Sequence, residues 1–187
     1  MRVARHPSLP KSVAGKRVGS QADFRLEAEV LRRLAGRKQT LALAESCTGG
    51  CVADRLTNVP GASTVFLGGV VAYSNAAKRK FLGVRAKTLT ARGAVSEAVA
   101  REMAEGARRK FGADFALGIT GIAGPGGGTK AKPVGTVFIA LAGAFGSVVE
   151  HRLNAYQRRK FKDVTARQAL ALLRLRLSKS GTLCACE

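Results

Sequence analysis

Three short segments of this 187-residue sequence combine glycine and small polar residues with side chains that can do chemistry. In the first, residues 44–50, Ser46 follows Glu45 at the end of an apolar run that is typical of a buried strand. Ligands of open α/β sheets bind where strands end and helices begin. Ser46 is therefore a candidate nucleophile, and the backbone amides of residues 48–50 are candidate donors to an anion or a developing oxyanion. Alternatively, Ser46 or Thr48 only caps the following helix.

The second segment, residues 71–78, contains Tyr73 and Lys78 at another expected strand end. Lys78 falls one turn into the predicted helix, where most lysines are solvated. A lysine desolvated beside a serine would instead be neutral and would accept its proton. The only histidines are His6 and His151, so the chain offers few candidates for the histidine of a Ser-His-Asp triad. A hydrolase built on Ser46 would need a lysine or a tyrosine as its base.

The third segment, residues 118–130, contains five glycines between Gly121 and Gly128. It follows a predicted strand, but the spacing of a nucleoside-triphosphate-binding loop is missing, because Thr129-Lys130-Ala131 stands where Gly-Lys-Ser/Thr is needed. Two interpretations stay open. The segment is either a flexible connector or a loop whose backbone approaches a small ligand.

The net charge is the unusual feature of the composition, because 32 Lys and Arg residues stand against 12 Asp and Glu residues. More than half of the +20 net charge lies in residues 1–20 and 151–187. Such an excess attracts nucleic acid, anionic membranes or phosphorylated metabolites. Aromatic residues make up only 5% and tryptophan is absent, so nucleic-acid binding is kept as the alternative rather than the main function. No apolar run reaches the ~20 residues of a membrane span.

The cysteines predict a reducing, cytoplasmic environment rather than a metal site or a disulfide framework. No Cys-x-x-Cys pair exists, and neither histidine is close to a cysteine in sequence. The four cysteines are Cys47, Cys51, Cys184 and Cys186. We therefore expect no bound metal and no cofactor.

Predicted helices and short apolar strands alternate along the chain, which indicates an α/β fold with a mixed sheet covered on both faces. We divide the chain into a flexible basic arm (1–20), one domain (21–180) and a short tail (181–187). Ser96 is expected to begin the longest helix. The expected strands are 39–44, 64–73, 115–121, 134–142 and 147–153, and the other expected helices are 23–36, 48–56, 75–82 and 160–178.

The three segments belong to a series of six motifs that together resemble the CinA C-terminal domain family, the competence-damage-inducible protein domain. The resemblance runs in order from about residue 24 to 178. The motifs are Glu45-Ser46-Cys47-Thr48-Gly49-Gly50, Val59-Pro60-Gly61, Tyr73-Ser74-Asn75-x-x-Lys78, Gly93-Ala94-Val95-Ser96, Thr120-Gly121-Ile122-Ala123-Gly124-Pro125-Gly126-Gly127 and Lys132-Pro133-Val134-Gly135-Thr136-Val137.

The resemblance implies a three-layer α/β/α sandwich with a mostly five-stranded sheet. It also implies a bacterial amidohydrolase that converts nicotinamide mononucleotide to nicotinate mononucleotide and ammonia in pyridine nucleotide (NAD) recycling. The family's nucleophile falls on Ser46 and its base on Lys78, with Tyr73 in the same motif. We also expect a homo-oligomer, a dimer or larger. A family member that binds nucleotide without turnover stays a second alternative.

The expected substrate contacts come from the first motif, the glycine-rich segment and one arginine near the last helix. The family usually has Gly-Asp-Arg or Gly-Asn-Arg before that helix, whereas Tyr156-Gln157-Arg158 stands here. The arginine is kept and the two residues before it are not. The assigned residues are Glu45, Thr48, Gly49, Gly50, Thr120, Gly121, Gly124 and Arg158.

The basic arm generates a prediction, because residues 1–20 carry five cations, no acid and no apolar period. Deleting them should change the melting temperature little and leave turnover of a small substrate within a few fold. Thermal unfolding and a rate assay of the shortened chain test this. A large fall in melting temperature would show that the arm packs on the domain.

Overall fold

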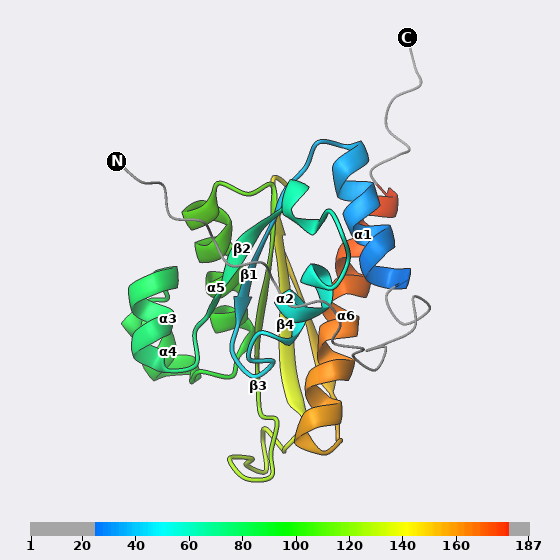
Figure 1. Ribbon diagram of the computed structural model, residues 1–187. Helices are drawn as coiled ribbons and strands as arrows, with labels where there is room; N and C mark the ends of the chain where they lie inside the picture. Colours follow the sequence, from blue (N-terminus) through cyan, green and yellow to red (C-terminus); the bar gives the residue numbers. More distant parts are fainter. Residues whose placement is uncertain (1–24, 180–187) are drawn as a thin grey trace, which may run out of the picture.

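The computed structural model describes residues 25–179, which form one mixed five-stranded sheet between two layers of helices (Figure 1). The strand order is β2-β1-β3-β4-β5. β1 pairs in parallel with β2 and β3, and the remaining pairs are antiparallel. The elements are α1 (Arg25–Gly36), β1 (Leu41–Glu45), α2 (Cys51–Thr57), η2 (Ala62–Thr64), β2 (Phe66–Val71), α3 (Asn75–Leu82), α4 (Ala86–Arg92), α5 (Glu97–Phe111), β3 (Phe115–Gly121), β4 (Thr136–Gly143), β5 (Gly146–Leu153) and α6 (Arg158–Lys179).

One face of the sheet carries the large apolar side chains and packs against α1, α2 and α6. Alternate residues of a strand point to opposite faces, so Leu41 and Leu43 of β1 face this layer. They pack in a buried cluster with residues such as Val30 of α1, Leu56 of α2 and Phe161 of α6. This cluster forms the main core of the domain.

The opposite face carries small residues, which let α5 lie close to the sheet. Ala42 and Ala44 of β1 pack there with Val99 and Met103 of α5. Gly118 of β3 makes the approach closest, since a Cβ built on it would lie 2.4 Å from the carbonyl oxygen of Ala100. The small side chains thus set the distance between α5 and the sheet.

Helix α3 packs on the outer side of α5 through a second close approach. A Cβ at Gly106 of α5 would lie 1.9 Å from the Leu82 carbonyl oxygen at the end of α3. Ser74 caps α3 by accepting a hydrogen bond from the Ala77 amide at 3.1 Å. Gly106 therefore fixes where α3 lies relative to the sheet.

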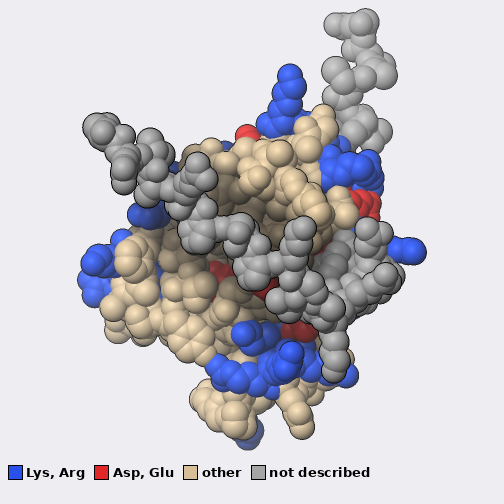
Figure 2. All heavy atoms as spheres, viewed as in Figure 1, with Lys and Arg blue, Asp and Glu red and all other residues tan. Residues whose placement is uncertain are grey.

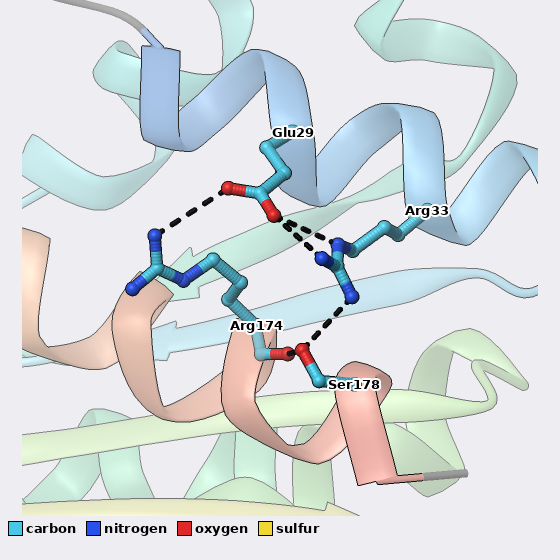
Figure 3. A network of polar contacts seen from close by, with 4 residues as sticks. All are labelled: Glu29, Arg33, Arg174 and Ser178. Carbon is cyan, nitrogen blue, oxygen red and sulfur yellow. Dashed lines mark hydrogen bonds and ion pairs between the residues drawn. The ribbon is translucent and has the colours of Figure 1, made fainter. Parts of the chain in front are cut away.

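In the helical layer formed by α1, α2 and α6, polar side chains also join α1 to the C-terminal half of α6 (Figure 3). Glu29 pairs with Arg33 one turn along α1 at 2.7 Å and with Arg174 of α6 at 3.4 Å. Arg33 also donates to the Ser178 hydroxyl at 2.8 Å. These partly exposed pairs contribute little individually, so the apolar core beneath them stabilises this helix pair.

The predicted fold class is confirmed, with three differences in the elements. The region 84–95, for which no helix was expected, contains α4. The longest helix is α6, with 22 residues against 15 in α5. Helix α2 begins at Cys51 rather than at Thr48, because Gly49 and Gly50 adopt positive φ angles before it. The expected arm and tail lie outside the described residues.

Lys and Arg side chains are spread over much of the surface and gather across the lower part of the face in Figure 2. No helix within residues 25–179 is both long and apolar enough to cross a membrane.

The Gly106 contact gives a stability prediction. Gly106→Ala should destabilise the domain by ~1–3 kcal/mol, because the new methyl group overlaps the backbone of α3. Gly36→Ala is the matched control, since nothing lies within 4 Å of a Cβ built there. Urea unfolding of both variants checks this, and equal stability of the two would contradict the close approach of α3 and α5.

Candidate active site

Ser46 lies at the carboxyl edge of the sheet, directly after β1, and strands on both sides hold it. Its amide donates to the Ile119 carbonyl of β3 at 3.0 Å. The preceding residue, Glu45, accepts a hydrogen bond on its carbonyl from the Ala72 amide after β2 at 2.8 Å. Ser46 is buried, with 8% of its surface exposed. Its backbone is therefore fixed by two neighbouring strands.

Lys78 of α3 reaches the same edge and contacts the Ser46 side chain. Its Nζ lies 2.9 Å from Ser46 Oγ and 2.9 Å from the Ala72 carbonyl oxygen. Lys78 is only 2% exposed, and this burial lowers its pKa from the ordinary lysine value of 10.5. Burial favours the neutral amine, which can accept the proton of a serine hydroxyl.

The neighbouring Cys47 does not compete with Ser46 as the nucleophile. It lines the same pocket but is 6% exposed, and burial raises the pKa of its thiol to about 12. Since the thiolate is the reactive form of cysteine, a thiol with this pKa is inert near neutral pH.

Glu45 holds the start of α2 instead of facing the pocket. Its carboxylate accepts hydrogen bonds from the amides of Gly50 at 3.0 Å, Val52 at 3.2 Å and Ala53 at 2.9 Å. This differs from its expected role as a substrate contact. The carboxylate satisfies amides that the first turn of a helix otherwise leaves without acceptors.

Two of the three amides expected to hold an oxyanion, those of Gly49 and Gly50, are engaged within the turn that follows Ser46. Gly49 donates to the Ser46 carbonyl at 3.1 Å, and Gly50 donates to Glu45. The Thr48 side chain is fully buried, and its hydroxyl has no hydrogen-bond partner within the described part of the chain. Residues 48–50 therefore shape the turn and present no free pair of amides.

Tyr73 and Arg158 meet at the rim of the site, although they are far apart in sequence. The Arg158 guanidinium donates to the Tyr73 hydroxyl and also to the Gly124 carbonyl at 2.8 Å. Arg158 is the first residue of α6, so this contact joins the β2–α3 connection, the glycine-rich loop and the last helix. Tyr73 is 60% exposed.

Together these groups line a pocket of about 300 Å³, at the small end of the range for small-molecule sites. It contains the predicted Ser46, Lys78, Tyr73, Thr120, Gly121, Gly124 and Arg158. The glycine-rich loop forms one wall, and its base is closed by backbone pairs between Ile122 and residues 135–136. Sequence reasoning missed Cys47, Asn75, Ala94 and Val95 as lining residues, although all four lie within the quoted motifs.

The segment Arg92–Val95 forms another wall, and side chains hold its carbonyl groups. Lys132 Nζ bonds the carbonyls of Arg92 at 3.0 Å and Val95 at 2.7 Å. Thr120, which is 1% exposed, donates its hydroxyl to the Ala94 carbonyl at 2.9 Å. Thr120 thus supports the wall, and Lys132 joins that wall to the glycine-rich loop.

A larger hollow of about 550 Å³ is also lined by Arg92 and Lys132, but four of its charged side chains form two ion pairs with one another. Arg85 pairs with Glu102 at 2.5 Å, and Arg101 pairs with Glu97 at 2.7 Å. The smaller pocket is the candidate active site, because it contains the serine–lysine pair. Among residues 25–179, no three His, Cys, Asp or Glu side chains gather in a way that could hold a metal ion.

The fold and this site define an α/β domain with a buried serine–lysine pair at the carboxyl edge of its sheet. The family model of the CinA C-terminal domain matches residues 23–177, and the chain belongs to this family.

Proteins of similar sequence carry names of the same family. A CinA-like protein of Anaeromyxobacter sp. (strain Fw109-5) is 53% identical over 94% of this chain and 43% of its own length. A putative competence-damage inducible protein of Moorella thermoacetica is 52% identical over 81% of this chain and 36% of its own length. The chain thus spans less than half the length of these relatives.

Solved structures of the superfamily match over nearly their whole length. The competence/damage inducible protein CihA of Agrobacterium tumefaciens is 38% identical with a TM-score of 0.81, covering 87% of this chain and 99% of its own. A CinA superfamily protein of Klebsiella pneumoniae is 36% identical with a TM-score of 0.80, covering 83% and 98%.

The position of Glu45 gives a prediction about the turn. Glu45→Gln replaces an accepting oxygen with an amide group and leaves a buried backbone N–H without its acceptor, which should cost ~1–3 kcal/mol of stability. Glu97→Gln is the control, because the side chain of Glu97 is 61% exposed and pairs only at the surface. If urea unfolding gives the two variants the same stability, Glu45 does not hold the start of α2.

Proposed function

We propose that this protein is an amidase that hydrolyses the carboxamide of nicotinamide mononucleotide, releasing nicotinate mononucleotide and ammonia through a Ser46 acyl-enzyme. The observation that carries the proposal is the buried Lys78 amine 2.9 Å from Ser46 Oγ. A hydroxyl at its ordinary pKa is a weak nucleophile and needs an adjacent base. This contact supports Lys78 as that base.

The first half of the reaction forms the ester. Neutral Lys78 accepts the Ser46 proton as Oγ attacks the carboxamide carbon, which gives a tetrahedral intermediate with a negative oxygen. The protonated Lys78 then donates its proton to the leaving nitrogen, and ammonia departs. The nicotinoyl group remains as an ester on Ser46.

The second half repeats the same proton transfers with water. Lys78 takes a proton from a water molecule, the resulting hydroxide attacks the ester carbon, and Ser46 recovers its proton as the acid product leaves. One base therefore serves both halves.

Two features of the pocket support a phosphorylated pyridine compound as the substrate. The wall at Gly124, Gly126 and Gly127 presents backbone without side chains, which allows a planar ring to come close. Arg158 begins α6, and Arg159 and Lys160 follow it as exposed cations in the first turn. Cations and a helix N-terminus both attract a phosphate group.

The proposal is tested by incubating the pure protein with nicotinamide mononucleotide and measuring ammonia and the acid product. Ser46→Ala should remain folded and lose at least ~10³-fold in turnover, as expected for the loss of a covalent nucleophile. Near-normal ammonia release by this variant would contradict the acyl-enzyme mechanism.

Lys78→Arg is the sharper variant, because arginine keeps the charge but cannot lose its proton. We expect it to be folded and to retain less than about a tenth of the wild-type turnover. Lys80→Arg is the matched control, since Lys80 is an exposed lysine of the same helix. Wild-type activity should rise with pH as Lys78 loses its proton, with a midpoint below the ordinary value of 10.5, because the protonated amine is inactive. A Lys78→Arg variant as active as Lys80→Arg would exclude Lys78 as the base.

A further inference from the structure

We propose that Lys132 is a positioning residue whose ammonium group holds one wall of the pocket to the glycine-rich loop and thereby sets the affinity for the substrate. This inference rests on the proposed amidase and concerns how the nucleotide binds, not how its amide bond is broken. Lys132 is not among the residues that line the pocket, so it acts on the substrate through the wall that it holds.

The wall Arg92–Val95 connects α4 to α5, and side chains accept the task of holding each of its four carbonyl groups. The first and the last carbonyl accept hydrogen bonds from Lys132 Nζ, at 3.0 Å and 2.7 Å. The second accepts from the Ser96 hydroxyl at 3.0 Å, and the third accepts from the Thr120 hydroxyl at 2.9 Å. The position of this wall therefore depends on three side chains, and Lys132 supplies two of the four bonds.

Of these three side chains, only that of Lys132 comes from the segment that follows the glycine-rich loop. Ser96 is the cap of α5, and Thr120 belongs to β3. The backbone of Lys132 forms a turn with Thr129, because its carbonyl accepts from the Thr129 amide at 2.8 Å and its amide donates to the Thr129 hydroxyl at 3.1 Å. Lys132 thus connects two parts of the pocket that are far apart in sequence.

Both parts that Lys132 connects line the pocket. Ala94 and Val95 line it from the wall, and the loop contributes residues such as Gly124 and Gly127. A lysine ammonium group has three donors, so one side chain can hold both ends of the wall at once. Walls that are already fixed before binding lose little conformational freedom when a ligand enters, which favours affinity.

The serine–lysine pair is held by other contacts. The Ser46 amide donates to β3, and Lys78 reaches the Ser46 hydroxyl from α3. Within residues 25–179, the hydrogen bonds of Lys132 reach the wall and Thr129 only. Removing the ammonium group should therefore weaken binding of the substrate and leave the acyl-transfer step nearly unchanged.

Lys132→Met tests this, because methionine keeps an unbranched stem and removes the three donors. Its KM for nicotinamide mononucleotide should rise at least ~10-fold, since a hydrogen bond from a charged donor contributes about that factor. Its kcat should stay within ~3-fold of the wild-type value. Lys130→Met is the matched control, because Lys130 is an exposed lysine of the same connection and its loss lowers the net charge equally.

The position of the wall can be measured without any substrate. Trypsin cleaves the bond after Arg92 when the wall opens locally, and mass spectrometry follows the appearance of this cut. Cleavage after Arg92 should be at least ~10-fold faster in Lys132→Met than in Lys130→Met, because proteolysis reports the population of the open segment.

The serine–lysine pair can be measured separately with a small fluorophosphonate probe. In this reaction Ser46 Oγ forms a bond to phosphorus, the phosphorus–fluorine bond breaks, fluoride leaves and the hydroxyl proton passes to Lys78. A probe without a pyridine ring or a ribose does not depend on the wall, so Lys132→Met and Lys130→Met should be labelled at the same rate.

The outcomes separate this inference from the proposed function. If the wild type is labelled but does not hydrolyse nicotinamide mononucleotide, the proposed substrate is wrong, and the cleavage comparison still decides whether Lys132 holds the wall. Equal KM values in the two variants, a fall in kcat in place of the rise in KM, slower labelling of Lys132→Met, or equal cleavage after Arg92 would overturn the assignment. A wild type that is neither active nor labelled would overturn both proposals.

Discussion

A buried lysine amine beside a serine hydroxyl is the constraint on which the rest of the site depends. Lys78 Nζ has Ser46 Oγ and the Ala72 carbonyl oxygen as its neighbours, and neither carries a negative charge. Burial without a carboxylate disfavours the ammonium form, so the pKa of Lys78 falls below that of the unfolded chain. The folded state is penalised at pH values below this lowered pKa, and the penalty disappears as the pH rises past the ordinary value.

The fold offsets this cost by fixing both partners from several directions. Ser46 is held through backbone pairs to the ends of β2 and β3, and the Glu45 carboxylate fixes the turn that leads into α2. Lys78 reaches Ser46 because α3 packs on α5, where Gly106 allows the two backbones to touch. A shift of either helix would separate the amine from the hydroxyl, which explains why small residues lie far from the pocket yet determine its geometry.

Apolar runs and glycine-rich turns leave local signals, which predicted the α/β class and the strand ends with Ser46 and Lys78 as candidates there. The resemblance to the CinA C-terminal domain family then assigned to these two residues the roles of nucleophile and base. It missed α4, whose residues 86–92 show no clear apolar period, and it assigned the amides of residues 48–50 to an oxyanion. For Gly50 that assignment differs from the structure, because the Glu45 carboxylate accepts the hydrogen bond of the Gly50 amide, a contact over five residues that spacing does not reveal. The contact of Arg158 with Tyr73 spans 85 residues and required the fold.

The protonation state of Lys78 is the most direct test of this account. Side-chain NMR of protein labelled at lysine with ¹³C and ¹⁵N can follow the Cε and Nζ resonances against pH, and the Lys78 signal is assigned by its absence from Lys78→Arg. The account predicts that Lys78 titrates below the other lysines, whose ordinary pKa is ~10.4. A Lys78 signal that titrates together with the exposed lysines, or above them, would contradict the assignment of a neutral amine beside Ser46.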